Sequence, residues 1–120
     1  MKIINIINAY NATEKLAGKK EFSVKDQWEI YQIRKFLRQK AEFYDERRDV
    51  LTEKYADKAD ENGKVYGKDA DDFFKDCNEL DNLDVDMSDY EKIQIRLVNG
   101  IDFKMIEQLE DFIEFLPPEE

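Results

Sequence analysis

Carboxylates are the side chains of this sequence whose spacing first suggests chemistry. They occur in three short groups: Asp69, Asp71 and Asp72; Asp84 and Asp86; Glu110 and Asp111. Acid–base catalysis needs two carboxyl groups whose surroundings push their pKa values apart, usually within a cleft. These groups alternate with apolar residues instead, which is typical of the solvated side of amphipathic elements. We therefore expect no catalytic residues here, and weak magnesium binding by Asp84 and Asp86 remains the alternative.

The stretch from Lys58 to Asp69 has the length of a calcium-binding loop. Asp60, Asn62 and Gly63 occupy its third, fifth and sixth positions, as in such loops. However, Lys58 stands at the first ligand position, where a cation would repel the ion. Asp69 also replaces the bidentate glutamate that closes these loops. The stretch is therefore predicted to be a solvated turn, with no metal bound.

Other catalytic machinery is missing from the sequence. The chain contains no histidine, the side chain most often used as a general base and as a metal ligand. Its only cysteine, Cys77, has apolar neighbours at helical spacing and no basic cluster beside it, so we expect a small core residue. No glycine-rich phosphate-binding motif occurs. These observations predict a protein that is not an enzyme and that uses no cofactor.

The charge of the chain is divided unevenly along its length. Residues 1–56 carry twelve Lys/Arg and nine Asp/Glu, whereas residues 57–120 carry seven and twenty, for a total of −10. Basic residues between Arg34 and Arg48 are interleaved with acidic ones, as on a solvated helix or one docked on the acidic half. Because the whole chain is negative, its long-range field repels nucleic acid. We expect no direct nucleic-acid binding.

Helical spacing predicts the elements of the first half. Apolar residues from Ile3 to Leu16 indicate a first helix that stops near Gly18. Ser23 and Asp26 form an approximate capping box at the start of a long helix, which we expect to run from Val24 to about Ala56. At 1.5 Å per residue this rod is about 50 Å long. It must project from the domain, break, or pack against another copy.

The second half has a mixed pattern. A third helix is predicted to begin at Asp69, with Phe73, Phe74, Cys77 and Leu80 on its inner face. Residues 83–87 and 93–97 alternate, which favours a small antiparallel hairpin, although a helix starting at Ser88 also fits. Asp102 is expected to cap a final helix that extends over residues 103–116 and stops at Pro117.

Together these elements predict a mainly α fold, with α+β as the alternative. We expect one domain over residues 1–120, with a long central helix, two or three shorter helices and at most one small hairpin. Asparagines interrupt the apolar residues of MKIINIINAY, so we expect neither a signal peptide nor a membrane span. A single cysteine fits a reducing compartment, and the expected location is the cytoplasm.

The concentration of acid in the second half suggests a surface for a basic protein. Spaced carboxylates can compete for a groove lined by Lys and Arg, because they resemble a row of phosphates. Aromatic side chains would add short-range affinity. The predicted partner-binding residues are Asp69, Asp71, Asp72, Asp84, Asp86, Tyr66 and Tyr90. The alternative is that the charge only keeps the protein in solution.

The order of elements predicted for residues 41–87 is a long charged helix, a turn, a short Phe-bearing helix and an acidic alternating segment. The sequence of this part is AEFYDERRDVLTEKYADKADENGKVYGKDADDFFKDCNELDNLDVDM. This arrangement resembles small acidic proteins encoded by bacteriophages of Gram-positive hosts, a family with no assigned function. The resemblance implies an accessory role in assembly or the tail, or inhibition of host defence such as CRISPR effectors, in the host cytoplasm. It carries over no catalytic residues.

Two functions follow as expectations. The first is a non-catalytic, phage-type factor that binds a basic protein through its acidic half, for example an inhibitor of a host nucleic-acid-binding defence protein. The second is a structural or assembly protein that forms a homo-oligomer through the long helix, along Phe36, Phe43 and Val50. Neither function requires a membrane.

Overall fold

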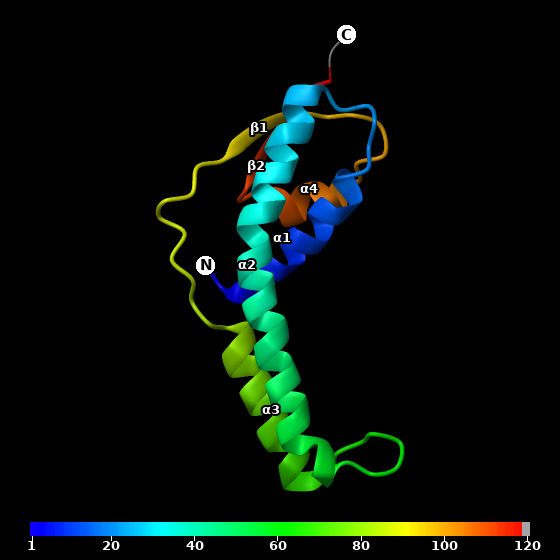
Figure 1. Ribbon diagram of the computed structural model, residues 1–120, viewed down its shortest axis with the longest axis vertical. Helices are drawn as coiled ribbons and strands as arrows, with labels where there is room; N and C mark the ends of the chain where they lie inside the picture. The colour runs from blue at the N-terminus through cyan, green and yellow to red at the C-terminus, as the bar shows by residue number, and fades with distance from the viewer. Residues whose placement is uncertain (119–120) are drawn as a thin grey trace.

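Helix α2 (Val24–Tyr55) runs along most of the length of the molecule (Figure 1). The computed structural model describes residues 1–118, and its longest dimension is 58 Å. As predicted, Ser23 caps α2, because its Oγ accepts a hydrogen bond from the Asp26 backbone N at 3.1 Å. The 32 residues of α2 give a rod of about 48 Å. One short 3₁₀ turn, η1 (Ala56–Lys58), follows it.

The first half of α2 packs into a region that we call the head, residues 1–40 and 83–118. It also contains α1 (Ile3–Leu16), β1 (Ile93–Arg96), α4 (Phe103–Leu109) and β2 (Ile113–Leu116). Helices α1 and α4 lie side by side across α2 (Figure 1). A single core cluster joins these elements: Ile6, Ala9, Ala12, Leu16, Phe22, Ile30, Ile33, Leu37, Ile95, Met105, Leu109, Phe112 and Ile113. The mainly α prediction is therefore correct.

The small sheet differs from the predicted hairpin. Strand β1 forms as expected, but it pairs with β2 in parallel, with Ile93 opposite Ile113 and Arg96 opposite Leu116. Helix α4 supplies the crossover that parallel strands require. Asp102 does cap α4, since its Oδ1 accepts from the Met105 backbone N at 2.8 Å. The helix ends at Leu109, so the prediction that it continues over residues 103–116 was wrong.

Residues 83–87 are extended, but their partner is the start of the chain. The Ile3 backbone N donates to the Leu83 carbonyl at 2.8 Å, and the Val85 backbone N donates to the Met1 carbonyl at 2.7 Å. The alternation was therefore correct for backbone conformation and wrong for pairing. The alternative helix starting at Ser88 does not form either, since residues 88–92 are a turn and an irregular segment that lead into strand β1.

The second half of α2 leaves the head and forms an arm, residues 41–82, with α3 (Gly67–Asp81) packed against it (Figure 1). Helix α3 begins at Gly67 rather than at Asp69, so Asp69 lies in its first turn and does not cap it. Cys77 is buried, as predicted, and Phe73 meets the Tyr55 ring edge-on at 5.3 Å. Of the three possibilities for the long helix, projection is the one observed.

Candidate functional site

The carboxylates singled out in the sequence lie in separate parts of the structure. Within residues 1–118, no group of three or more side chains is placed to hold a metal ion. Asp69, Asp71 and Asp72 lie in the first turns of α3, whereas Asp84 and Asp86 follow its other end. Because α3 has 15 residues, its length of about 22 Å separates the two groups. The predicted aspartates therefore lie in two groups, one near each end of α3.

Polar contacts hold the two helices of the arm together. The Tyr55 hydroxyl donates to Asp76 Oδ2 at 2.8 Å, and Lys54 Nζ lies 3.1 Å from the same oxygen. Hydrogen bonds from Tyr55 and then from Lys54 lower the pKa of Asp76. Nearer the head, the Tyr44 hydroxyl donates to Asp81 Oδ1 at 2.6 Å. These carboxylates are therefore structural ties between α2 and α3.

Burial and the Asp81 contact affect the Tyr44 hydroxyl strongly. Desolvation, followed by the hydrogen bond to Asp81, raises the pKa of Tyr44 to about 12. Both causes favour the neutral phenol, which alone can donate this hydrogen bond. Tyr44 is therefore a hydrogen-bond donor that ties α2 to α3 at neutral pH.

The loop that resembles a calcium site is closed by its own side chains. Asp60 Oδ1 accepts from the backbone N of Asn62 and of Lys64, both at 2.9 Å. Asp60 Oδ2 accepts from the Tyr66 hydroxyl at 2.8 Å. The bond from the Lys64 backbone, and then that from Tyr66, lower the pKa of Asp60. Lys58 pairs with Asp69 at 3.5 Å, which joins the first and twelfth residues of the stretch.

The outer face of α3 presents an aromatic ring among charged groups. Phe74 is 67% exposed, although the sequence pattern assigned it to the inner face with Phe73. It lines a shallow depression with these polar neighbours: Asp71, Lys75, Asn78, Glu79 and Asn82. Two adjacent phenylalanines on a helix point about 100° apart, so only one can face α2. No pattern in the sequence indicates which of the two rings faces α2.

The remaining predicted binding residues have different environments. Tyr66 is exposed at the tip of the arm, close to the first turn of α3. Tyr90 is packed against the core instead, where its hydroxyl donates to the Phe112 carbonyl at 2.6 Å and its ring stacks on Phe36. Burial raises the pKa of Tyr90. This tyrosine therefore serves the fold and is not an exposed anchor.

The acidic segment after α3 also contributes to structure. Asp84 Oδ1 accepts from the α-amino group of Met1 at 2.7 Å, and Asp86 Oδ1 accepts from the Ser88 backbone N at 2.9 Å. The Ser88 bonds are the main cause of a lowered pKa at Asp86. Both carboxylates help to fix the extended segment beside the head.

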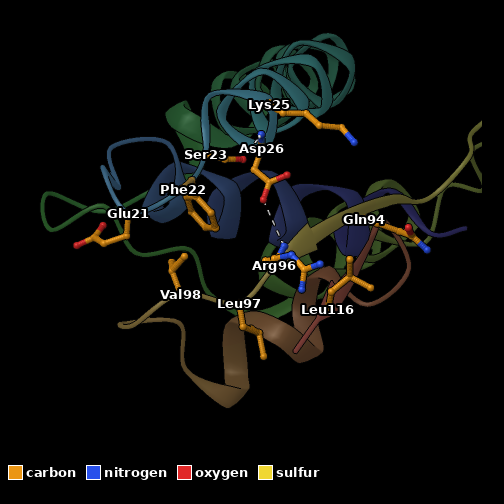
Figure 2. A pocket seen from close by; sticks show the side chains of 10 residues that line it. All are labelled: Glu21, Phe22, Ser23, Lys25, Asp26, Gln94, Arg96, Leu97, Val98 and Leu116. Carbon is orange, nitrogen blue, oxygen red and sulfur yellow. Dashed lines mark hydrogen bonds between the residues drawn. The ribbon is translucent and has the colours of Figure 1, made fainter. Parts of the chain in front are cut away.

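Figure 2 shows a pocket of about 480 Å³ between the start of α2 and the end of the sheet. Its charged side chains are Glu21 in the loop before α2, Lys25 and Asp26 on α2, and Arg96 on β1. Asp26 Oδ2 accepts from the Arg96 backbone N at 3.4 Å, and the Arg96 guanidinium donates to the Pro117 carbonyl at 3.2 Å. These polar groups tie the sheet to the helix.

A groove runs between α2 and α3 on another side of the arm. It has a volume of about 390 Å³, and its apolar lining residues are Phe43, Val50, Leu51, Leu80 and Leu83. Phe43 and Val50 belong to the predicted self-association stripe and remain exposed, whereas Phe36 stacks on Tyr90. The stripe is therefore divided between the head and the arm.

Among the helices of residues 1–118, none combines the length and the apolar composition that crossing a bilayer requires. Comparison of the chain with protein-family models, with curated proteins and with solved structures finds no match.

Proposed function

We propose that this chain is a non-catalytic factor that binds a partner protein through the outer face of α3. The observation that carries the proposal is Phe74, 67% exposed and flanked by Asp71 and Glu79 on the projecting arm. Exposed aromatic rings with charged neighbours are typical of interface hot spots, because the ring supplies buried area and the charges supply orientation.

The charge of the arm indicates the kind of partner. Residues 41–82 contain fourteen Asp/Glu and seven Lys/Arg. Asp71 is exposed, and Asp69 and Asp72 are half-exposed in the same first turns of α3. A negative surface on a projecting element attracts a basic surface over a distance of about 10 Å at moderate salt. The proposed partner is therefore a protein with a basic groove or patch.

A narrower version of the proposal concerns nucleic-acid-binding proteins of host defence. A groove lined by Lys and Arg that normally holds phosphates can also accept a row of carboxylates. The resemblance of residues 41–87 to small phage proteins supports an inhibitor of this kind, acting in the host cytoplasm. The single cysteine is compatible with a reducing compartment.

A capture experiment with matched variants tests the proposal. Tagged wild-type protein is used to capture partners from host or infected-cell lysate, beside Phe74→Ala and Phe103→Ala variants. Phe103 is the control, because it is a phenylalanine of the head that is 78% exposed. We expect Phe74→Ala to lose the partner and Phe103→Ala to retain it. Equal retention by both variants would contradict a role for the α3 face.

Charge reversal tests whether the acidic side chains of the arm attract the partner. The double variant Asp71→Lys, Asp72→Lys changes the arm, and Glu110→Lys, Asp111→Lys makes the same charge change in the head. The affinity of the wild type for the captured partner should fall with salt, and only the arm variant should weaken it about tenfold or more. Binding that is insensitive to salt, or equally weakened by both double variants, would contradict the proposal.

Self-association is the second candidate function, favoured by the apolar groove at Phe43 and Val50. Packing of two such grooves would form a four-helix arrangement of the arms. Sedimentation over a hundredfold range of concentration tests it, with Val50→Lys as the disrupting variant. A monomer at every concentration would contradict this function.

A further inference from the structure

A second surface, of opposite charge, lies on the head beside the end of α1. A pocket of about 200 Å³ opens there between α1 and α2. It is lined by two guanidinium groups, two other polar side chains and apolar ones, chiefly Arg34, Arg38, Gln27, Tyr31, Leu16 and Ile30. None of its lining residues is acidic. Two positive charges therefore meet in a small space without a carboxylate among them.

Tyr10 of α1 holds both arginines in position. The Arg34 guanidinium carbon lies 5.6 Å from the centre of the Tyr10 ring, in a cation–π contact. A side-chain hydrogen bond with Tyr10 is the main cause of a raised pKa at Arg38, and the charge of Glu42 adds a smaller effect. Arg34 and Arg38 are one turn apart on the same helix, so their side chains are neighbours and both can reach a single anion.

Arg34 is only partly compensated by the protein. Its side chain is half-buried, and within residues 1–118 its Nε is the buried side-chain polar atom that has no hydrogen-bond partner. A partly desolvated cation attracts an anion more strongly than a hydrated one, because less water competes for its charge. The geometry therefore favours an anionic group at the mouth of this pocket.

Aromatic rings adjoin the pocket on the solvent side of α2. Trp28 and Tyr31 stack with their ring centres 5.6 Å apart, yet they remain 57% and 55% exposed. Val24, one turn earlier, is also exposed. These residues lie at i, i+4 and i+7 on one ridge of the helix, away from the core. The ridge can cover an apolar side chain of a partner while the neighbouring pocket holds its charge.

The surrounding charge distinguishes this surface from the arm. Residues 1–40 contain nine Lys/Arg and four Asp/Glu, the reverse of the acidic balance in the rest of the chain. Lys35 continues the ridge one turn after Tyr31 and is exposed. The lining of the pocket is itself positive, because it contains two arginines and no carboxylate, and this lining attracts an acidic ligand.

We propose that the Arg34–Arg38 pocket and the Trp28–Tyr31 ridge form a docking site for an acidic protein segment. One carboxylate of the segment enters between the two guanidinium groups, and a neighbouring apolar or aromatic side chain lies on the stacked rings. The pocket is smaller than the usual range of about 300–1,000 Å³ for small-molecule sites, so it suits a single side chain. This site is separate from the α3 face and selects a partner of the opposite charge.

The only tryptophan of the chain, Trp28, reports directly on this site. The experiment titrates the full chain with a synthetic Glu-Phe-Glu-Glu-Phe-Glu peptide, and separately with the same peptide in which Gln replaces each Glu. We expect the acidic peptide to shift the Trp28 emission to shorter wavelength and the Gln peptide to have little effect. Arg38→Gln should weaken the acidic peptide by about 10- to 100-fold, the range for a lost charge-assisted hydrogen bond.

Arg47→Gln is the matched control, because it removes the same charge from an exposed position farther along α2. It should leave peptide binding unchanged. Arg34→Gln should weaken binding as Arg38→Gln does. If the half-buried Arg34 variant unfolds by circular dichroism, the exposed Arg38 variant still decides the result, since its side chain lies at the surface.

Several outcomes separate the possible occupants. A Trp28 shift with protein concentration alone, abolished by Arg38→Gln, would identify the acidic segment of a second copy and support the site. Tighter binding of a single-stranded oligonucleotide than of the peptide, with the same arginine dependence, would overturn the proposal in favour of a phosphate site. Equal competition by inorganic phosphate, or no response of Trp28 to the acidic peptide, would also overturn it.

Discussion

The head and the arm share one helix but are stabilised in different ways. In the head, thirteen buried residues from several elements form one apolar cluster. In the arm, the buried hydrophobic residues among those described are Tyr55 and Cys77. Hydrogen bonds from Tyr44 and Tyr55 to carboxylates of α3 supplement this small core. The same helix α2 is therefore a core element in one half and a partner in a two-helix hairpin in the other.

This difference indicates where the molecule can open. Regions with few buried apolar contacts and solvent-exposed hydrogen bonds unfold locally at lower free energy than the core. The arm meets both conditions, and it also bears the exposed Phe74. The head supplies a fixed base, while the arm presents a surface whose local order depends on polar ties.

The largest expected effect is a core truncation in the head. Phe112 is 1% exposed, and its ring contacts Tyr90 edge-on. Phe112→Ala should lower the free energy of unfolding by about 3–5 kcal/mol, because it removes apolar contacts and leaves a cavity. Urea denaturation measures this change. The control Phe103→Ala, at an exposed position of the head, should stay within about 0.5 kcal/mol, and a similar loss for both variants would contradict the assignment of Phe112 to the core of the head.

A smaller effect is expected from the polar ties of the arm. Tyr55→Phe removes the hydroxyl that donates to Asp76. It should cost about 0.5–1.5 kcal/mol, the usual net value of one hydrogen bond. Hydrogen exchange should become faster in α3 and in the second half of α2, with little change in α1. Faster exchange throughout the molecule would show that the arm and the head open together.

Alkaline pH provides a test that is specific to Tyr44. Its pKa is raised to about 12 from an ordinary 10, so the folded state holds this proton more tightly than the unfolded state. The contribution of the Tyr44–Asp81 hydrogen bond to the free energy of unfolding is fully present below pH 10, and it should be lost as pH rises from about 10 to 12. Comparison of wild type with Tyr44→Phe by urea denaturation across this window measures it. Identical pH profiles would contradict the assigned role of the Tyr44–Asp81 bond.

The smallest effect is expected in acid, at Asp76. Its pKa is lowered below the ordinary 3.8, chiefly by the hydrogen bond from Tyr55 and then by that from Lys54. The contribution of ionised Asp76 to the free energy of unfolding is present above the pKa that Asp76 has in the unfolded chain. It is lost as pH falls through the lower pKa of the folded state, so the arm should loosen below about pH 4. Hydrogen exchange of α3 in Asp76→Asn should change less with acid than that of wild type. If acid speeds hydrogen exchange of α3 equally in Asp76→Asn and in wild type, the loosening of the arm comes from other carboxylates.

The sequence allowed the helices of the first half to be predicted almost to the residue. The repeat from Ile3 to Leu16 and the Ser23 cap are local signals, and local hydrogen bonds form a helix. The Asp102 cap was also correct for the same reason. The end of that last helix was not, because Leu109, Phe112, Ile113 and Leu116 keep helical spacing, whereas β2 forms through its pairing with the remote strand β1.

The surfaces were predictable only in part. Counting charges showed that the second half is acidic. It did not show that Tyr90 faces the core, that Phe74 faces solvent, or that Arg34 and Arg38 both contact Tyr10. Each of these facts depends on a neighbour that is remote in the sequence.

Local order and charge were therefore determined by the sequence itself, through periodicity, caps and composition. Tertiary structure alone decided three features: the parallel pairing of β1 with β2, the pairing of residues 83–87 with the start of the chain, and the side of each helix left exposed. The physical reason is that a helix hydrogen bond joins residues four positions apart, whereas a strand or a buried ring needs a partner that only the folded chain brings near.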